Sequence, residues 1–214
     1  MEDVLEVYAR KPVAARPLVC LDEFSKQLLS QVAAALPATP KDGDKPAHHK
    51  REEAEYVREG SASAFMIAAP HLGIREVFVG EKGQRTSKEY AEAVELLCDG
   101  MFPEAEKIVL VQDNLNTHNA ASLYKVFPPE KARRLAEKIE WHYTPRHGSW
   151  LNIAECEISV LARAALHRRI GSLREFEEAI EKNTEQRNAD PRPVKWQFTT
   201  SDARVKLKHL YPKL

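Results

Sequence analysis

Residues 106–118 read EKIVLVQDNLNTH and residues 139–155 read IEWHYTPRHGSWLNIAE, and these two stretches decide the fold. The first contains an apolar run, Ile108 to Val111, that is typical of a buried strand and is closely followed by Asp113. The second contains another short strand, Ile139 to Tyr143, then a loop with Pro and Gly, then the start of a helix that carries Glu155. Hard divalent cations bind carboxylate oxygens on a rigid scaffold, so two acids at such positions suggest a metal site.

A third acid, Asp22, follows the apolar run from Pro17 to Leu21 far upstream. A single Asp at a strand end is weak evidence, because such residues commonly cap turns. Two metal ions that cleave a phosphodiester require several carboxylates from different elements at one place. Asp22, Asp113 and Glu155 meet this requirement if the fold brings them together.

The other elements predict an α/β protein with a mixed sheet. An early hairpin is expected from the apolar runs at 61–69 and 74–79, which a turn separates. Helices are expected at 86–97, 120–126, 129–137, 152–168 and 172–188. Three strands, then helix, strand, helix, strand and helices is the order of a ribonuclease-H-like fold, in which a mixed five-stranded sheet is flanked by helices. Its first and fourth strands are adjacent, which would place Asp22 next to Asp113.

The chain divides into three expected parts. Residues 1–16 are expected to be an extended lead-in segment, 17–188 a ribonuclease-H-like catalytic domain, and 189–214 a basic C-terminal extension packing on that domain. Lys26 to Leu36 is apolar, with weak helical or strand character. Residues 37–60 are the most loop-like part, and loops of this length are uncommon unless they are functional or disordered.

Composition limits the classes of protein. The 214 residues carry 32 Lys and Arg against 32 Asp and Glu, whereas a dedicated nucleic-acid binder is usually basic. Basic residues do outnumber acidic ones from Arg163 onward. No apolar run approaches the ~20 residues of a membrane span, and the N-terminal residues lack the apolar core of a signal peptide, so a cytoplasmic protein is expected. Cys20, Cys98 and Cys156 are expected to be reduced core thiols.

The segments around the three acids resemble the DDE transposases of bacterial insertion sequences, specifically the IS six-thirty family of the mariner-like superfamily. The matching stretches are VCLDEFSKQLL, EAEKIVLVQDNLNTHNAASLY, WHYTPRHGSWLNIAECEISVLAR and, near the C-terminus, WQFTTSDARVKLKHLYP. The resemblance implies a ribonuclease-H-like fold, two Mg²⁺ ions that Mn²⁺ can replace, and DNA cleavage followed by strand transfer. It maps the catalytic and metal-binding acids onto Asp22, Asp113 and Glu155.

Two neighbouring acids compete for these roles. The family's third acid lies in an Asn-x-x-acid pattern, which Asn152 to Glu155 match. Glu157 would point about 200° away from Glu155 on a helix, so the two acids cannot both face one metal pair. Glu23 should point to the opposite side of its strand from Asp22, where a structural role or a role as an auxiliary surface charge is expected.

Further residues are candidates for DNA contacts or auxiliary roles: Asn114, His118, Arg146, His147 and Asn152. His118 either lies near the scissile phosphate or orients an acid, or it only hydrogen-bonds to the backbone of its loop. Arg146 suits a phosphate contact, and Gly148 permits close backbone approach. Trp150 either stacks on a base or belongs to the core.

The leading hypothesis is a transposase catalytic domain, a DDE-type endonuclease and strand transferase that acts on double-stranded DNA at transposon ends. It would act as a homodimer in a bacterial cytoplasm, associated with the nucleoid. A helix-turn-helix module that reads the terminal repeats is expected outside this chain or in a partner. The alternatives are a catalytically silent DNA-binding or regulatory remnant, and a nuclease of the same fold that cleaves RNA–DNA hybrids.

Overall fold

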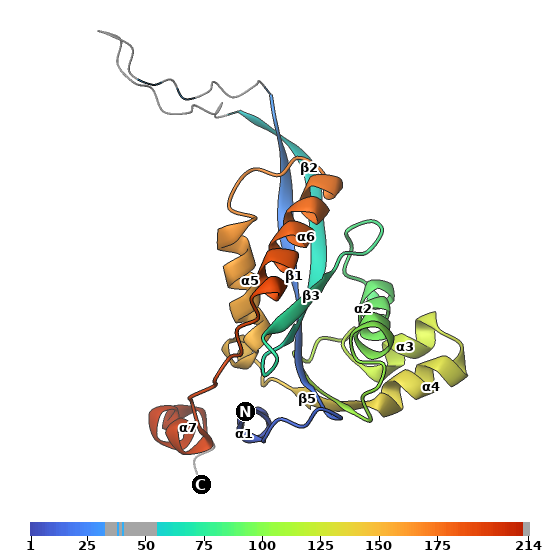
Figure 1. Cartoon of the computed structure of the whole chain (residues 1–214), viewed down its shortest axis with the longest axis vertical. Coiled ribbons are helices and arrows are strands. Elements are labelled where there is room, and N and C mark those ends of the chain that lie inside the picture. Colours follow the sequence, from blue (N-terminus) through green and yellow to red (C-terminus); the bar gives the residue numbers. More distant parts are fainter. Residues whose placement is uncertain (33–37, 39, 41–54, 212–214) are drawn as a thin grey trace.

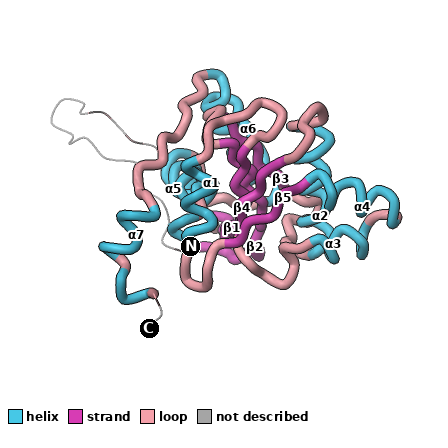
Figure 2. Tube along the Cα trace, turned by 90° about the horizontal axis from the view of Figure 1, so that it is seen from below, coloured by secondary structure: helices cyan, strands magenta, loops and turns pink. Residues whose placement is uncertain are grey.

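The computed structural model describes residues 1–32, 38, 40 and 55–211. Its centre is a five-stranded sheet in the order β3-β2-β1-β4-β5, with helices on both faces (Figures 1 and 2). The strands are β1 (Leu18–Gln31), β2 (Tyr56–Ala69), β3 (Ile74–Phe78), β4 (Ile108–Gln112) and β5 (Ile139–Tyr143). Since β1 pairs with β2 in antiparallel and with β4 in parallel orientation, the sheet is mixed. The expected α/β fold with adjacent first and fourth strands is confirmed.

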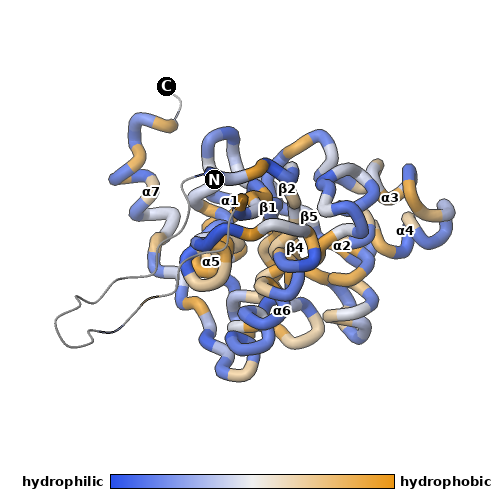
Figure 3. Tube along the Cα trace, turned by 90° about the horizontal axis from the view of Figure 1, so that it is seen from above, coloured by the Kyte–Doolittle hydropathy of each residue, from blue (hydrophilic) through white to orange (hydrophobic). Residues whose placement is uncertain are grey.

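The helices cover the two faces of the sheet in two groups. One face carries α1 (Glu2–Ala9), α5 (Ile153–Ala164) and α6 (Leu173–Ala189), and α7 (Thr200–Lys206) lies outside α1 on the same side. The other face carries α2 (Ser87–Glu95), the π-helical turn Leu96–Met101, α3 (Ala120–Val126) and α4 (Pro129–Lys138). The central strands and α5 contain many hydrophobic residues, whereas α6 is largely hydrophilic (Figure 3).

Alternating residues of β1 pack into two separate cores. Leu18 and Cys20 belong to the core under α1 and α5, while Val19 and Leu21 belong to the core under α2 and α3. This alternation is the normal consequence of strand geometry, in which successive side chains point to opposite faces. A strand buried on both faces reads as a continuous apolar run, which explains why these strands were recognisable in the sequence.

β1 and β2 form a ribbon that extends well beyond the rest of the sheet (Figure 1). The expected weak element at Lys26 to Leu36 is strand as far as Gln31, and its residues 33–36 lie outside the described residues. The pairing is irregular at Leu28 and Leu29, where Gly60 supplies a φ of 113° that favours glycine. Of the expected loop at 37–60, residues 56–60 belong to β2, while 37, 39 and 41–54 lie outside the described residues.

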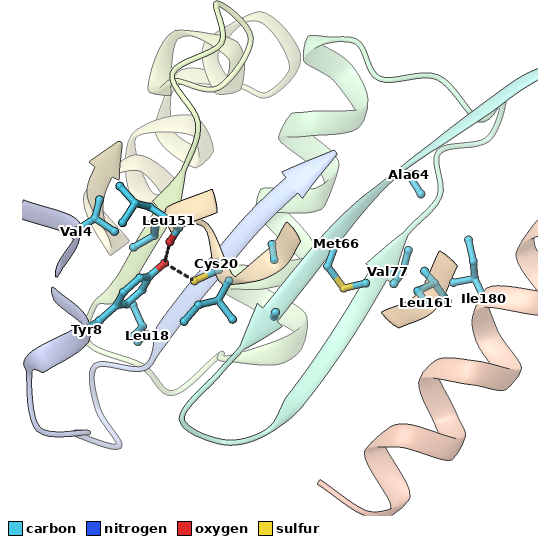
Figure 4. Packing of buried hydrophobic residues seen from close by; sticks show 14 of the residues in the cluster. Val4, Tyr8, Leu18, Cys20, Ala64, Met66, Val77, Leu151, Leu161 and Ile180 are labelled. Carbon is cyan, nitrogen blue, oxygen red and sulfur yellow. Dashed lines mark hydrogen bonds between the residues drawn. The ribbon is translucent and has the colours of Figure 1, made fainter. Parts of the chain in front are cut away.

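The expectation of an extended lead-in was wrong. Residues 2–9 form α1, because Val4, Leu5 and Tyr8 share one helix face and are all buried. The Tyr8 hydroxyl donates a 2.6 Å hydrogen bond to the carbonyl of Leu151 (Figure 4). This contact ties α1 to the turn that precedes α5.

Other boundaries differ less. α5 ends at Ala164, where the sequence predicted a helix reaching Arg168. The expected helix at 86–97 is present as α2, which starts with a capping box of Thr86 and Glu89. Cys20 and Cys98 are buried free thiols as expected, whereas Cys156 is exposed. In the described part of the chain no helix is long and apolar enough to cross a membrane.

Candidate active site

Two of the three acids come from neighbouring parallel strands. Cys20 of β1 pairs with Val111 of β4, and continuing this register by two residues puts Asp22 beside Asp113. β1 continues past the end of β4, so Asp22 lies inside a strand and is buried, while Asp113 begins a loop and is half-buried.

Asn152 connects β1 to the start of α5. Its side-chain oxygen caps the helix by accepting a hydrogen bond from the amide of Ala154 (3.1 Å). Its Nδ2 donates to the carbonyl of Leu21 (2.9 Å) and to Oδ2 of Asp22 (3.0 Å). Because Asn152 is fully buried, these bonds fix the first turn of α5, which carries Glu155, against Asp22.

The three acids influence one another electrostatically. Burial, and after it the negative charges of Glu155, Asp113 and Glu23 in that order of size, together raise the pKa of Asp22 to about 7. A divalent cation among these carboxylates would relieve the repulsion. Mg²⁺ and Mn²⁺ prefer oxygen ligands, so Asp22, Asp113 and Glu155 form a donor set that fits such ions.

A second group of side chains lies on the other face of β1. Nδ1 of His118 and Oδ1 of Asp113 share a short hydrogen bond, and Nε2 of His118 lies 3.2 Å from Oε2 of Glu23. Of the alternatives for the His118 ring, these contacts fit the one in which it orients an acid rather than hydrogen-bonding to the backbone of its loop. Glu23 points away from Asp22 as expected, but it is not a surface charge, because its side chain is only 10% exposed. Ligand atoms of Glu23, Asp113 and His118 lie within 4.8 Å of one another, a spacing able to hold a metal ion, and among the described residues this spacing is found for these three and not for Asp22, Asp113 and Glu155.

Glu157 has partners of its own. It is buried, forms an ion pair with Nε of Arg75 at 2.9 Å, and accepts hydrogen bonds from Arg187. These contacts join α5 to β3 and α6 and engage the Glu157 carboxylate in a structural role. Of the two glutamates on α5, Glu155 is the one whose charge acts on Asp22.

The remaining candidate residues lie on exposed loops beside the acids. Arg146, His147 and Asn114 are exposed, and His147 has a φ of 61°, which is uncommon for a residue other than glycine. Trp150 is 45% exposed and packs edge-on against Phe198 at 5.7 Å, so it is not a core residue. A Cβ on Gly148 would lie 2.6 Å from the ring of Pro145, so the close approach at this glycine is internal to the loop.

Sequence reasoning missed two residues behind His118. Tyr90 of α2 stacks on the His118 ring at 4.7 Å, and its hydroxyl donates a 2.8 Å hydrogen bond to Oε1 of Gln112. Gln112 in turn donates to the carbonyl of His118 at 2.9 Å. A glutamine at the end of an apolar strand, next to Asp113, was the one signal in the sequence that pointed to such a network.

We expect Asp22→Asn to stabilise the metal-free protein at pH 8. The folded-state pKa of Asp22 is raised from 3.8 to about 7, so the folded state binds more protons in this window and loses stability as the pH rises through it. The whole shift corresponds to about 4 kcal/mol. Asn cannot fully replace the carboxylate as acceptor for Asn152. The net gain in the free energy of unfolding should therefore be about 1–2 kcal/mol, or roughly 3–6 °C in Tm.

Thermal unfolding in EDTA at pH 4 and pH 8 measures this effect. The gain should vanish at pH 4, where the wild-type carboxyl is protonated. Glu81→Gln at an exposed position serves as the matched control and should leave Tm unchanged at both pH values. A variant less stable than wild type at pH 8 would contradict the assigned burial and repulsion.

Two solved structures show the same fold at low sequence identity. A Mos1 transposase paired-end complex with the left transposon end superposes with a TM-score of 0.50 at 14% identity, over 90% of this chain and 61% of that one. The Mos1 strand transfer complex also gives 0.50 at 14% identity, over 89% and 59%. This chain thus spans about three fifths of the length of those proteins. No curated protein sequence matched the chain.

A sequence profile supplies the family. The profile described as DDE superfamily endonuclease matches residues 17–177, which includes β1, β4, α5 and all three candidate acids. The match covers most of the chain and begins at the residue before β1. This chain therefore belongs to the DDE superfamily endonuclease family.

Proposed function

We propose that this chain is the catalytic domain of a DNA transposase, which cleaves DNA at transposon ends and transfers the strand to a target. The observation that supports the proposal is that Asp22 lies where burial and the charges of Glu155 and Asp113 all raise the pKa of its carboxyl group. The repulsion among these negative charges favours the binding of a cation. The family match and the Mos1-like fold support the same reaction class.

In this proposal Asp22, Asp113 and Glu155 hold two Mg²⁺ or Mn²⁺ ions. Ions held by these residues would supply activation of the attacking oxygen and stabilisation of the leaving oxygen of a phosphodiester. Asn152 orients Asp22 and fixes the helix start that carries Glu155. The family is one of endonucleases, and solved Mos1 structures contain Mn or Mg.

The exposed loop before α5 is the proposed DNA contact. Arg146 is able to pair with a backbone phosphate, and the half-exposed ring of Trp150 is able to stack on an unpaired base beside the acids. The left-handed backbone at His147 fits this role, since strained residues concentrate at functional sites. Asn114 follows Asp113 on the neighbouring loop and is exposed toward solvent.

The finer assignments are part of the proposal. The motif resemblance supports an origin in a bacterial insertion sequence of the IS six-thirty family. The paired-end complex of Mos1 supports a homodimer that holds two DNA ends. A helix-turn-helix module would supply recognition of the terminal repeats, since the net charge of zero leaves this chain little general affinity for DNA.

The experiment is nicking of supercoiled plasmid by the purified chain with Mg²⁺ or Mn²⁺, with EDTA as the control. A parallel reaction on an RNA–DNA hybrid separates a transposase from a hybrid-cleaving nuclease of the same fold. Nicking of DNA that requires the metal and exceeds cleavage of the hybrid is the expected result. Binding of DNA without nicking, also with transposon-end DNA and Mn²⁺, would support the catalytically silent remnant instead.

A further inference from the structure

His118 is held more tightly than a loop residue needs to be. Its side chain is 1% exposed, although it lies in the loop between β4 and α3. Its ring stacks on Tyr90 with an interplanar angle of 19°, and Phe65 contacts its edge at a centroid distance of 6.1 Å. Its backbone carbonyl accepts the hydrogen bond from Gln112. The imidazole therefore has one fixed orientation.

In that orientation the two ring nitrogens face two different carboxylates. Nδ1 faces Asp113 at the end of β4, and Nε2 faces Glu23 on β1 at 3.2 Å. Glu23 is in turn held from outside by Arg85 at 3.4 Å. These contacts form a continuous row of side chains from the surface to a candidate metal ligand: Arg85, Glu23, His118 and Asp113.

Asp113, at the inner end of this row, has few other contacts that fix its carboxylate. It is the least buried of these carboxylates, with a side chain 27% exposed, and it starts a loop rather than ending inside a strand. One further bond to Asp113 comes from the amide of Leu115, at a long 3.4 Å. By contrast, Asp22 accepts hydrogen bonds from the amide of Glu23 and from Asn152.

We propose that the Glu23–His118 pair is a positioning device that sets the orientation of the Asp113 carboxylate for metal binding. This inference rests on the proposed function, because it assumes that Asp113 is a metal ligand. His118 is here a positioning residue and not itself a ligand. Hydrogen bonds behind a ligating carboxylate typically change metal affinity about 10–100-fold when they are removed.

The contacts of the two ring nitrogens of His118 can be removed one at a time. In His118→Asn the side-chain amide takes the place of Nδ1 and still donates to Asp113. In His118→Gln the amide reaches the place of Nε2 and keeps only the partner Glu23. Calorimetric titration with Mn²⁺ should show affinity within about 3-fold of wild type for the Asn variant and a loss of about 10–100-fold for the Gln variant.

A matched pair of controls comes from His142, which also lies between two carboxylates, with Nδ1 2.8 Å from Asp3 and Nε2 3.0 Å from Glu140. Its Asn and Gln variants should bind Mn²⁺ like wild type. Glu23→Gln and Glu23→Leu give a second comparison, because both remove the charge but only Gln keeps an acceptor for Nε2. The Leu variant should bind Mn²⁺ more weakly than the Gln variant. If His118→Gln does not fold, this Glu23 comparison tests the proposal in its place.

The outcomes separate the two proposals. If the wild type binds no Mn²⁺, the proposed metal site fails and this inference fails with it. If the wild type binds and the Asn and Gln variants of His118 lose affinity equally, only the positioning role is overturned. A complete loss of binding in both variants, with wild-type binding intact, would make His118 a metal ligand in the Glu23, Asp113 and His118 group.

Discussion

Replacing Glu155 with Gln should lower the rate of metal-dependent DNA nicking by about 10³-fold or more. Gln keeps the size and hydrogen-bonding capacity of the side chain but removes the charge that a divalent cation needs from its ligand. Metal stabilisation of a phosphodiester transition state is worth several kcal/mol, and a loss of about 4 kcal/mol is ~10³-fold in rate. Nicking of supercoiled plasmid over a range of Mn²⁺ concentrations measures the effect.

Glu157→Gln is the matched control, since the same change is made two residues further along α5. Glu157 accepts hydrogen bonds from Arg187 and pairs with Arg75, away from the charges that act on Asp22. Its nicking rate at low temperature should stay within about 3-fold of wild type, after correction for the folded fraction. If both variants nick like wild type, a contaminating nuclease or a different metal site is at work. If only Glu157→Gln loses nicking, Glu157 is the third acid.

The position of Asp22 beside Asp113 was predictable because it depends on strand order alone. Each acid follows a run of consecutive apolar residues, and a strand buried on both faces has this composition. Once the first and fourth strands are adjacent and parallel, their register places Asp22 beside Asp113. Asn152 was also identifiable, since a helix that starts at Ile153 needs a cap residue at that position.

The partners of Glu23 and Glu157 were not predictable in the same way. Alternation along β1 correctly placed Glu23 opposite Asp22, yet what covers that face is set by α2 and α3, far along the chain. Arg75 and Glu157 are on β3 and α5, and no local pattern links them. Ion pairs between distant elements depend on the packing of helices on the sheet, which hydrophobic periodicity does not specify.

The helix α1 was missed for a different reason. Its eight residues are short for an isolated helix, and the charged residues among them favour a solvated segment. The helix is stable because Val4, Leu5 and Val7 pack into the core formed by β1 and α5. Tertiary packing thus decides the conformation of a segment whose own propensity is weak.

Replacing Glu157 with Ala should destabilise the fold by about 3–5 kcal/mol, which is the typical cost of leaving a buried charge without its partner. The side chain of Arg75 is 4% exposed, and its desolvation already lowers its pKa, while Glu157 acts in the opposite direction. Without Glu157, the hydrogen bonds that the Arg75 guanidinium still donates go to neutral oxygens, of Gly73 at 2.8 Å and of Asn188 at 3.2 Å. For a chain of this length the loss corresponds to roughly 10 °C in Tm.

A double variant shows whether the lost charge pair or the lost volume causes the effect. Arg75→Met with Glu157→Leu removes both charges and refills the space, and well-packed apolar residues often replace a buried ion pair without loss. It should be at least about 1 kcal/mol more stable than Glu157→Ala in denaturant unfolding. A double variant as unstable as Glu157→Ala would mean that the hydrogen bonds of Arg75 to Gly73 and Asn188 carry the stability. In that case Arg75 joins β3 to α6 mainly through Asn188, and the carboxylate of Glu157 contributes mainly by balancing the buried charge of Arg75.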